Sequence, residues 1–269
     1  MWFLSRDVSC VAIITSVLVS IAFGADSKKP SLRIIPIGDS ITWGYGSSDG
    51  NGYRLRLRKL LSDNSVTYLG HWHSGSMSNN NNEGYSGLEI SDIETYVKGN
   101  GTLGEDPNLI LILAGTNDIN LDHNASTAPE RLGSLIDLVT AACPDATVIV
   151  SEITSIWGVD QQERVDAFNA ALPGIVAKRN GSSLLNKHVL ALNMTSYVTA
   201  NDLFDGLHPT DVGYQKMAEG WMNGIMQVAE RGWLNVSISE DKNDGSGSRT
   251  NLSGILMFLA FFWVLMIWS

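Results

Sequence analysis

The chain has 269 residues, of which 44% are hydrophobic and 17% charged, and its formal net charge is −10 at pH 7. Binding to nucleic acid needs clustered Lys and Arg to neutralise phosphates, so this acidic balance argues against a nucleic-acid partner. Two cysteines, Cys10 and Cys143, are too few for a disulfide framework, and the fold must therefore be held together by packing.

The first residues are typical of a secretory signal. Arg6 precedes an apolar stretch over residues 8–21, and the small-residue pattern Ala22-Phe23-Gly24 follows it. We expect residues 1–24 to be removed by cleavage after Gly24 and the protein to be exported. An uncleaved N-terminal anchor is the alternative interpretation.

Residues 25–235 alternate apolar runs with helical patterns, which is typical of a parallel sheet covered by helices on both faces. We predict five strands, at residues 32–37, 66–69, 109–113, 147–150 and 188–192. Apolar spacing predicts a helix that begins near Pro129 and a last helix after Thr210 or Asp211, either of which can cap it. Between them we expect a helix that buries Val165, Phe168, Leu172, Ile175 and Val176. The expected fold is one α/β domain, a three-layer α/β/α sandwich around a central, mostly parallel five-stranded sheet.

A serine and a histidine stand in polar segments near opposite ends of this domain. Ser40 follows the first predicted strand in Gly38-Asp39-Ser40, and His208 closes Asp205-Gly206-Leu207-His208. A serine hydroxyl is a weak nucleophile, so it needs an imidazole to take its proton and a carboxylate to orient that imidazole. Ser40, His208 and Asp205 can fill these three roles.

Two further segments offer groups that can stabilise a developing negative charge. Asn117, in Gly115-Thr116-Asn117-Asp118, follows the strand predicted at 109–113 and brings a side-chain amide to its carboxyl end. Gly84 closes a polar loop, and a glycine allows its backbone N–H to approach a ligand closely. Ligands of open parallel sheets bind at the carboxyl ends of the strands, so these groups can converge there.

The four segments, in this order, resemble the four sequence blocks of the SGNH hydrolases, the GDSL-type esterase superfamily. The resemblance spans most of the predicted domain. It implies ester hydrolysis with Ser40 as nucleophile and a triad completed by Asp205 and His208. It also implies an oxyanion hole made by the N–H groups of Ser40 and Gly84 and by the amide of Asn117. The G-x-S-x-G motif of the ordinary α/β-hydrolases is absent around Ser40.

A narrower resemblance concerns the runs Gly38 to Gly44, Asn51 to Arg54 and Glu83 to Gly87. These are similar to the carbohydrate esterase branch that includes acetyl xylan esterases, which implies O-acetyl groups on a polysaccharide such as xylan as substrate. Trp43 and Tyr85 are candidates to stack on a sugar ring, with packing as the alternative. The competing functions are a lipid or general carboxylesterase (lysophospholipase-like) and a carbohydrate-binding surface protein without turnover.

Several other residues receive structural interpretations. We expect Asp39 and Asp118 to brace their turns, Arg54 to pair with a buried carboxylate, and Cys143 to be a small buried residue. His71-Trp72-His73 lacks further ligands at recognisable spacing, so we expect it to lie at a strand end or in a substrate groove. Neither a metal nor another cofactor is predicted. The polar run at 74–82 is expected to be a loop that is mobile or rims the site.

The asparagines of five N-glycosylation sequons are expected to face solvent: Asn100, Asn124, Asn180, Asn193 and Asn235. Residues 236–251 form a polar linker, and 252–269 a hydrophobic end without the flanking basic residues that hold a transmembrane helix. This layout predicts removal of the end and a glycolipid anchor at Asn243, Asp244, Gly245 or Ser246. We expect a monomer at the cell surface, acting on an acylated carbohydrate or other small ester.

Overall fold

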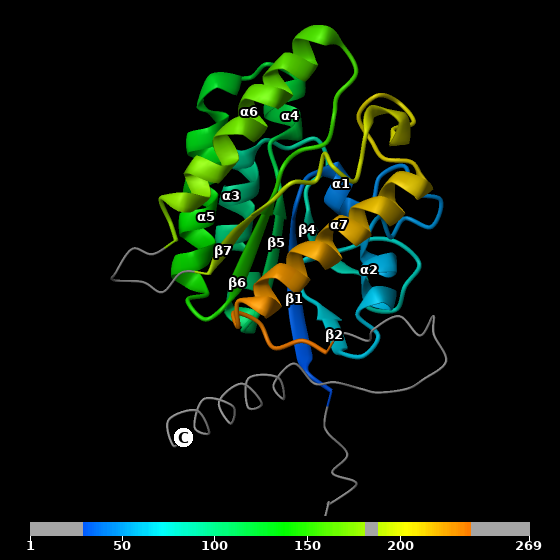
Figure 1. Cartoon of the computed structure of the whole chain (residues 1–269), viewed down its shortest axis with the longest axis vertical. Helices are drawn as coiled ribbons and strands as arrows, with labels where there is room; N and C mark the ends of the chain where they lie inside the picture. Colours follow the sequence, from blue (N-terminus) through cyan, green and yellow to red (C-terminus); the bar gives the residue numbers. More distant parts are fainter. Residues whose placement is uncertain (1–28, 181–187, 238–269) are drawn as a thin grey trace, which may run out of the picture.

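The computed structural model describes residues 29–180 and 188–237 (Figure 1). The predicted signal at 1–24, the hydrophobic end at 252–269 and most of the linker lie outside the described residues. Export and anchoring therefore stay predictions. Within the described ranges, the structure contains no helix with the length and apolar character needed to cross a membrane.

The domain is built around a sheet of seven strands in the order β3-β4-β1-β5-β6-β7, with β2 also pairing with β1. Five of these strands are the predicted ones: β1 (Ser31–Gly38), β2 (Ser65–Tyr68), β5 (Leu109–Leu113), β6 (Thr147–Ser151) and β7 (Val189–Leu192). They run parallel to one another. Every residue of β5 and β6 is buried, as expected for strands that are covered on both faces.

The prediction of five strands missed two short ones, β3 (Trp72–His73) and β4 (Asn81–Gly84). The first half of β1 pairs with β2, whereas its last two residues, Ile37 and Gly38, pair with β4. β5 pairs with the other edge of β1. The strands β2 and β4 therefore lie one after the other along the same edge of β1. β3 then adds to β4 in the antiparallel direction. β3 has two residues and β4 has four polar or small ones, so neither shows the apolar pattern of a buried strand.

The polar run at 74–82 is held by hydrogen bonds from its own side chains rather than being a loose loop. Asn79 accepts the N–H of Tyr68 (2.6 Å) and donates to its carbonyl oxygen (2.9 Å), as a neighbouring strand would. Asn82 donates to the Ser74 hydroxyl (3.0 Å). Side-chain amides here replace backbone partners, which explains how an Asn-rich segment enters the sheet.

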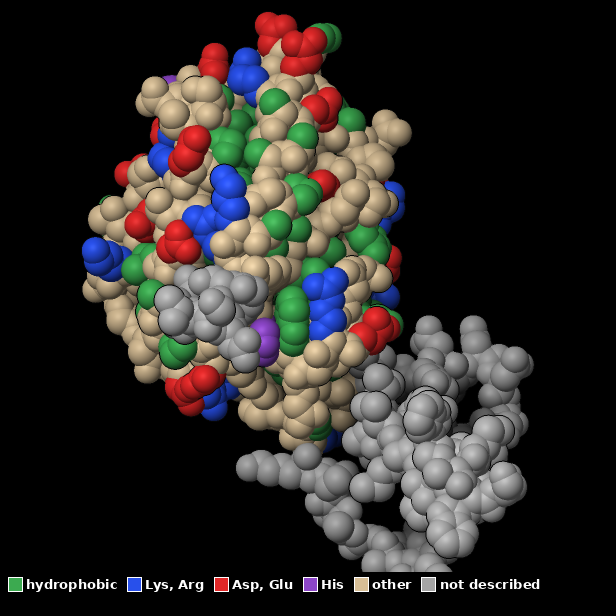
Figure 2. All heavy atoms as spheres, turned by 60° about the vertical axis from the view of Figure 1, so that its left-hand side comes forward, with side chains coloured by type: hydrophobic (Ala, Val, Ile, Leu, Met, Phe, Trp, Pro, Cys, Tyr) green, Lys and Arg blue, Asp and Glu red, His purple; other side chains and the backbone are tan. Residues whose placement is uncertain are grey.

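Helices cover both faces of the sheet (Figure 1). The helices α3 (Ile90–Gly99), α5 (Ala128–Ala142) and α6 (Val159–Ala177) lie side by side on one face, and α2 (Arg54–Leu60) and α7 (Asp211–Glu230) lie together on the other. The three-layer α/β/α prediction is confirmed. On the face turned forward in Figure 2, acidic and basic side chains are interspersed rather than separated by sign.

The helix boundaries agree with the capping predictions. α7 begins after Thr210, whose hydroxyl accepts the N–H of Gly213 (3.1 Å). α5 carries a proline in its first turn, as predicted from Pro129. Cys143, at the end of α5, is buried, and burial raises the pKa of its thiol. The remaining helices are short: α1 (Ser40–Trp43), α4 (Thr116–Asn120), η1 (Thr102–Glu105), η2 (Ala125–Thr127) and η3 (Ala200–Asp202).

Arg54 is fully buried on the inner side of α2, but it has no carboxylate partner among the described residues. Its guanidinium donates to the carbonyl oxygens of Trp43 (3.0 Å), Ser74 (3.1 Å) and Asn80 (2.8 Å), and to the Ser74 hydroxyl (2.7 Å). The expectation of a buried ion pair was wrong because the neighbouring turns supply enough carbonyl oxygens. Burial lowers the pKa of Arg54.

We expect Arg54→Met to lower the free energy of unfolding by about 3 kcal/mol or more. The substitution leaves buried carbonyl oxygens without donors, and each such group costs about 1–3 kcal/mol. Urea unfolding followed by circular dichroism measures the change. The matched control is Arg56→Met on the exposed side of the same helix, expected within about 0.5 kcal/mol of wild type. Equal stabilities of the two variants would contradict this role of Arg54.

Candidate active site

Ser40 is placed by a sharp turn from β1 into α1. The carboxylate of Asp39 caps α1 by accepting the N–H of Ile41 (2.9 Å), which confirms the bracing role predicted for it. Gly38 leaves no room for a side chain, since a Cβ there would lie 2.1 Å from the carbonyl oxygen of Leu113. Within the described part of the chain, the N–H of Ser40 has no acceptor. It can therefore donate to a ligand.

The Ser40 hydroxyl meets the ring of His208 although 168 positions separate the two residues. The distance from Ser40 Oγ to His208 Nε2 is 2.9 Å. The other ring nitrogen, Nδ1, lies 2.7 Å from Oδ2 of Asp205. The loop before α7 thus brings both members of the Asp-x-x-His segment to the carboxyl edge of β1.

Backbone N–H groups of its own loop hold the carboxylate of Asp205 in place. Its Oδ1 accepts the N–H groups of Leu207 (3.0 Å) and His208 (2.8 Å). Burial on its own would raise the pKa of Asp205, but the hydrogen bonds from His208 and Leu207 outweigh it and hold the pKa below the ordinary value. The carboxylate is therefore charged at neutral pH. It favours a proton on Nδ1 of His208, which leaves Nε2 able to accept the proton of Ser40.

Two exposed aromatic rings flank His208. The ring centroid of Tyr45 lies 4.5 Å from that of His208, and the centroid of Phe204 lies 6.0 Å away. Tyr45 is anchored to the last helix because the hydroxyl of Tyr214 donates to its carbonyl oxygen (2.7 Å). The sequence analysis missed both rings. The available signal was their position in the chain, directly after α1 and directly before Asp205.

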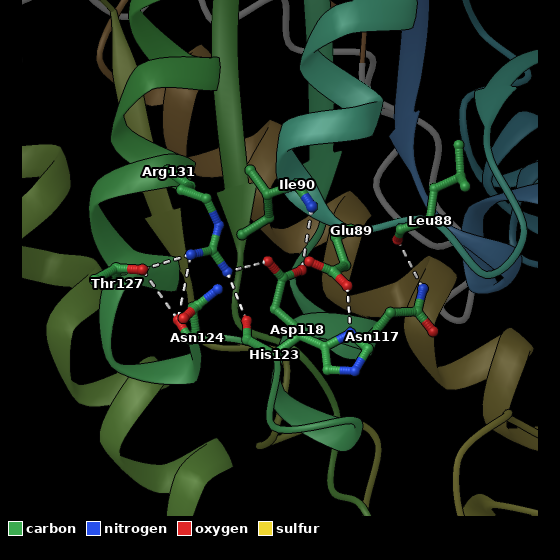
Figure 3. A network of polar contacts seen from close by, with 9 residues as sticks. All are labelled: Leu88, Glu89, Ile90, Asn117, Asp118, His123, Asn124, Thr127 and Arg131. Carbon is green, nitrogen blue, oxygen red and sulfur yellow. Dashed lines mark hydrogen bonds and ion pairs between the residues drawn. The ribbon is translucent and has the colours of Figure 1, made fainter.

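Asn117 is fixed in the site by its neighbour Asp118 (Figure 3). The buried carboxylate of Asp118 accepts the N–H of Ile90 (3.1 Å) and pairs with Arg131 (2.6 Å), so it joins α4 to α3 and α5. The bracing role predicted for Asp118 is confirmed. Asn117 Nδ2 uses one hydrogen on the carbonyl oxygen of Leu88 (2.8 Å), and its second hydrogen has no acceptor in the described residues.

Gly84 is not the free donor that the sequence predicted. Its N–H donates to the side-chain oxygen of Asn82 (3.0 Å). A Cβ on Gly84 would lie 2.4 Å from the backbone nitrogen of Trp43, so the residue is a glycine because β4 packs closely against α1. The prediction of an oxyanion donor at Gly84 is therefore corrected by the structure.

Gly87, three residues later, has the properties that were expected of Gly84. It is exposed, its φ of +80° is in the left-handed region, and a Cβ there would have no atom within 4 Å. Its N–H has no acceptor in residues 29–180 and 188–237. Leu88, the next residue, accepts the hydrogen bond from Asn117. Gly87 thus has an available N–H and directly precedes the residue whose carbonyl oxygen contacts the Asn117 amide.

A cleft of about 340 Å³ opens beside these groups. We call it the aromatic cleft, and its side-chain lining is Trp43, Trp72, Tyr85, Ser86, Leu88 and Tyr96. Trp43 and Tyr85 were predicted as sugar contacts, and both line the cleft, although Tyr85 is only 5% exposed. Trp72 also lines the cleft, in agreement with the substrate-groove role considered for His71-Trp72-His73, whereas Tyr96 was missed. No hydrophobic pattern distinguishes an exposed aromatic residue from a packed one.

Tyr85, which lines the cleft, is held in place by the buried carboxylate of Glu83. It accepts hydrogen bonds from the hydroxyls of Tyr85 and Thr102 (2.6 Å for Thr102), from the side chain of Asn100 (2.6 Å) and from the N–H of His71 (2.6 Å). Asn100 is thus half-buried, and the nitrogen to which a glycan would attach is engaged. The expectation that Asn100 faces solvent was wrong, because its side-chain amide donates a hydrogen bond to the buried carboxylate of Glu83.

Of the other four sequon asparagines, one is half-buried and three are exposed. Asn180 is half-buried, and its amide pairs with both backbone groups of Val189, so its predicted exposure is also corrected. The remaining sequon asparagines are exposed as expected: Asn124, Asn193 and Asn235. As for metals, the described residues contain no group of three or more His, Cys, Asp or Glu side chains that could hold an ion.

A parallel α/β sheet that gathers a serine, a histidine and an asparagine amide at its carboxyl edge defines a carboxylic ester hydrolase of the SGNH type. The chain belongs to the GDSL-like Lipase/Acylhydrolase family, whose model matches residues 37–216. The match includes Ser40, Asn117 and His208.

Several proteins that are similar to this chain are named as esterases. It is 28% identical over 246 residues to the multidomain esterase of Ruminococcus flavefaciens, covering 80% of this chain but only 31% of that protein. The family 3 carbohydrate esterase of Clostridium thermocellum is similar in structure, with 27% identity and a TM-score of 0.64 over 75% of this chain and 98% of that one. A family 3 carbohydrate esterase of Talaromyces cellulolyticus has the same fold (22% identity, TM-score 0.63, 74% and 99% coverage).

Proposed function

We propose that this protein is a serine esterase that removes acetyl groups from a polysaccharide such as xylan. The observation that carries the serine mechanism is the 2.9 Å contact between Ser40 Oγ and His208 Nε2, with Asp205 behind the ring. The similarity to a family 3 carbohydrate esterase supports a sugar ester as substrate. The export predicted from the N-terminus would give the enzyme access to a polymer outside the cell.

The reaction runs in two displacements. His208 Nε2 takes the proton of Ser40 as its oxygen attacks the acyl carbonyl, and the resulting imidazolium gives that proton to the departing sugar oxygen. Water then repeats the cycle: it gives a proton to Nε2, attacks the acyl-enzyme, and releases acetate while Ser40 regains its proton. Asp205 stabilises the imidazolium in both halves.

Three donors are proposed to hold the negative oxygen of each tetrahedral intermediate: the N–H of Ser40, the N–H of Gly87 and the free amide hydrogen of Asn117. Asn117→Ala is expected to lower kcat by about 10²–10³-fold, the usual effect of removing one such donor. Steady-state kinetics on an acetate ester measure this, and a thermal melt reports the loss of the bond to Leu88. Asn120→Ala, in the same helix, is the control and should stay within about twofold of wild type. Equal kcat values for the two variants would remove Asn117 from the oxyanion hole.

Substrate release assays test the proposed function as a whole. Acetate release from acetylated xylan and acetylated pectin is compared with hydrolysis of a short series of synthetic acyl esters, with Ser40→Ala as the blank. We expect wild type to prefer acetyl esters and acetylated xylan. A strong preference for long acyl chains would instead indicate a lipid or general carboxylesterase. Absence of turnover, together with no labelling by a fluorophosphonate probe, would indicate a carbohydrate-binding protein.

A further inference from the structure

We propose that the aromatic cleft binds a neutral sugar ring of the ester's alcohol part, stacked against Trp72 and Tyr96. This inference rests on the proposed function and goes beyond it by assigning the residues that select the alcohol. Neither residue belongs to a sequence block that carries the catalytic groups.

The cleft lies directly beside the reacting groups. Trp43, in its wall, is in the same short helix as Ser40, and Gly84 packs against the backbone of Trp43. On the other wall, the carbonyl oxygen of Leu88 is 2.8 Å from Asn117 Nδ2. A group bound in the cleft is therefore next to an ester carbonyl that is held by Asn117 and attacked by Ser40.

The two proposed contact residues present unusually open rings. Trp72 is 45% exposed and Tyr96 is 55% exposed, although both line a hollow of about 340 Å³. Large aromatic side chains that stay uncovered in a concave site are typical of ligand contacts. The apolar C–H face of a sugar ring can cover such rings while its hydroxyls remain in water. The cleft is also much larger than an acetyl group requires.

The rings are fixed before any ligand binds. The buried ring of Tyr85 stacks on Tyr96, with centroids 5.2 Å apart and planes at 22°, and meets Trp72 at 6.4 Å in an edge arrangement. The hydroxyl of Tyr85 is anchored by Glu83 and Asn100. The backbone of Trp72 is held in β3 against β4. Rings that are already ordered lose little conformational entropy on binding, which favours affinity.

The charge of the lining selects against acidic sugars. None of the described residues that line the cleft is charged, so no Lys or Arg there can bind the carboxylate of a uronic acid. The carboxylate of Glu83 lies behind Tyr85 and forms no ion pair with a basic side chain among the described residues. A neutral ring such as that of xylose therefore fits the cleft better than a uronate.

The experiment uses Trp72→Ala, Tyr96→Ala and the conservative variants Trp72→Phe and Tyr96→Phe. For each enzyme, kcat/KM is measured on acetylated xylo-oligosaccharides, acetylated oligogalacturonides, ethyl acetate and ethyl hexanoate. Each alanine variant should lower the ratio of kcat/KM on the xylo-oligosaccharide to that on ethyl acetate by about 5–10-fold, mainly through KM. The phenylalanine variants should recover most of this ratio. Leu121→Ala, exposed and outside the cleft, should leave it unchanged.

The outcomes separate the two proposals. If wild type releases acetate from acetylated oligosaccharides but the alanine variants keep the wild-type ratio, the cleft assignment is overturned and the proposed function stands. A loss confined to ethyl hexanoate would overturn it too, by assigning the cleft to an acyl chain. Equal wild-type rates on the neutral and the acidic oligosaccharides would overturn the neutral-sugar selectivity. No release from any acetylated sugar would instead refute the proposed function itself.

Discussion

Ser40→Ala is expected to reduce kcat on an acetate ester by about 10⁴–10⁶-fold while the protein stays folded. The substitution removes the oxygen that attacks the carbonyl, and the loss of a nucleophile in a triad removes most of the catalysis. The side-chain hydrogen bond of Ser40 among the described residues is the one to His208, at 2.9 Å, and alanine leaves the turn that Asp39 caps in place. The measurement is steady-state kinetics with a thermal melt of the same sample.

Ser48→Ala serves as the matched control for Ser40. Ser48 is an exposed serine on the loop after α1, and it contacts Asp211 only through its backbone N–H (2.8 Å). Its kcat should lie within about twofold of wild type. If Ser40→Ala retained more than a few per cent of the wild-type kcat, another residue would have to be the nucleophile.

Asp205→Asn should lower kcat by about 10³–10⁴-fold. The asparagine oxygen can still accept the N–H groups of Leu207 and His208, so the loop should keep its shape. An amide facing Nδ1, however, neither stabilises the imidazolium nor secures the tautomer in which Nε2 accepts the Ser40 proton. Kinetics on an acetate ester, with circular dichroism to verify the fold, measure the effect.

Asp211→Asn provides the comparison for a carboxylate near the site but outside it. Asp211 begins α7 and accepts the N–H of Ser48 rather than contacting His208. This variant should keep its kcat within about twofold. A kcat for Asp205→Asn equal to that of Asp211→Asn would show that the ring of His208 does not depend on the carboxylate.

The sequence predicted those elements whose signal is local in the chain. β5, β6 and the part of β1 from Ile34 onward are buried and apolar, and all three strands lie within two residues of their predicted positions. Ser40 and Asn117 follow such strands directly, which made their meeting at one edge of the sheet predictable. β3 and β4 have no such signal, because they are held by backbone pairing and by asparagine side chains.

The wrong predictions for the site have one common cause. Each concerned which hydrogen-bond partner a group has in the folded chain. The segment Glu83 to Gly87 holds two glycines, and only the side chain of Asn82 decides that the N–H of Gly84 is engaged while that of Gly87 is not. Arg54 likewise finds carbonyl oxygens from two distant turns. Such pairings depend on tertiary structure and leave no periodic trace in the chain.

Because β2 and β4 divide one edge of β1, the cleft residue Trp72 and the residues that place the nucleophile lie on different segments. The residues from Gly70 to Asn80 connect these strands and deliver Trp72, whereas Ser40 is positioned by β1 and by the contact of Gly38 with β5. Substitutions at Trp72 would reshape the neighbouring cleft without moving the nucleophile, whereas Ser74 and Asn80 of the same connection also bind Arg54 beside Trp43. The proposed selectivity for the alcohol can therefore change by substitution at this one position, while the hydrolytic groups stay in place.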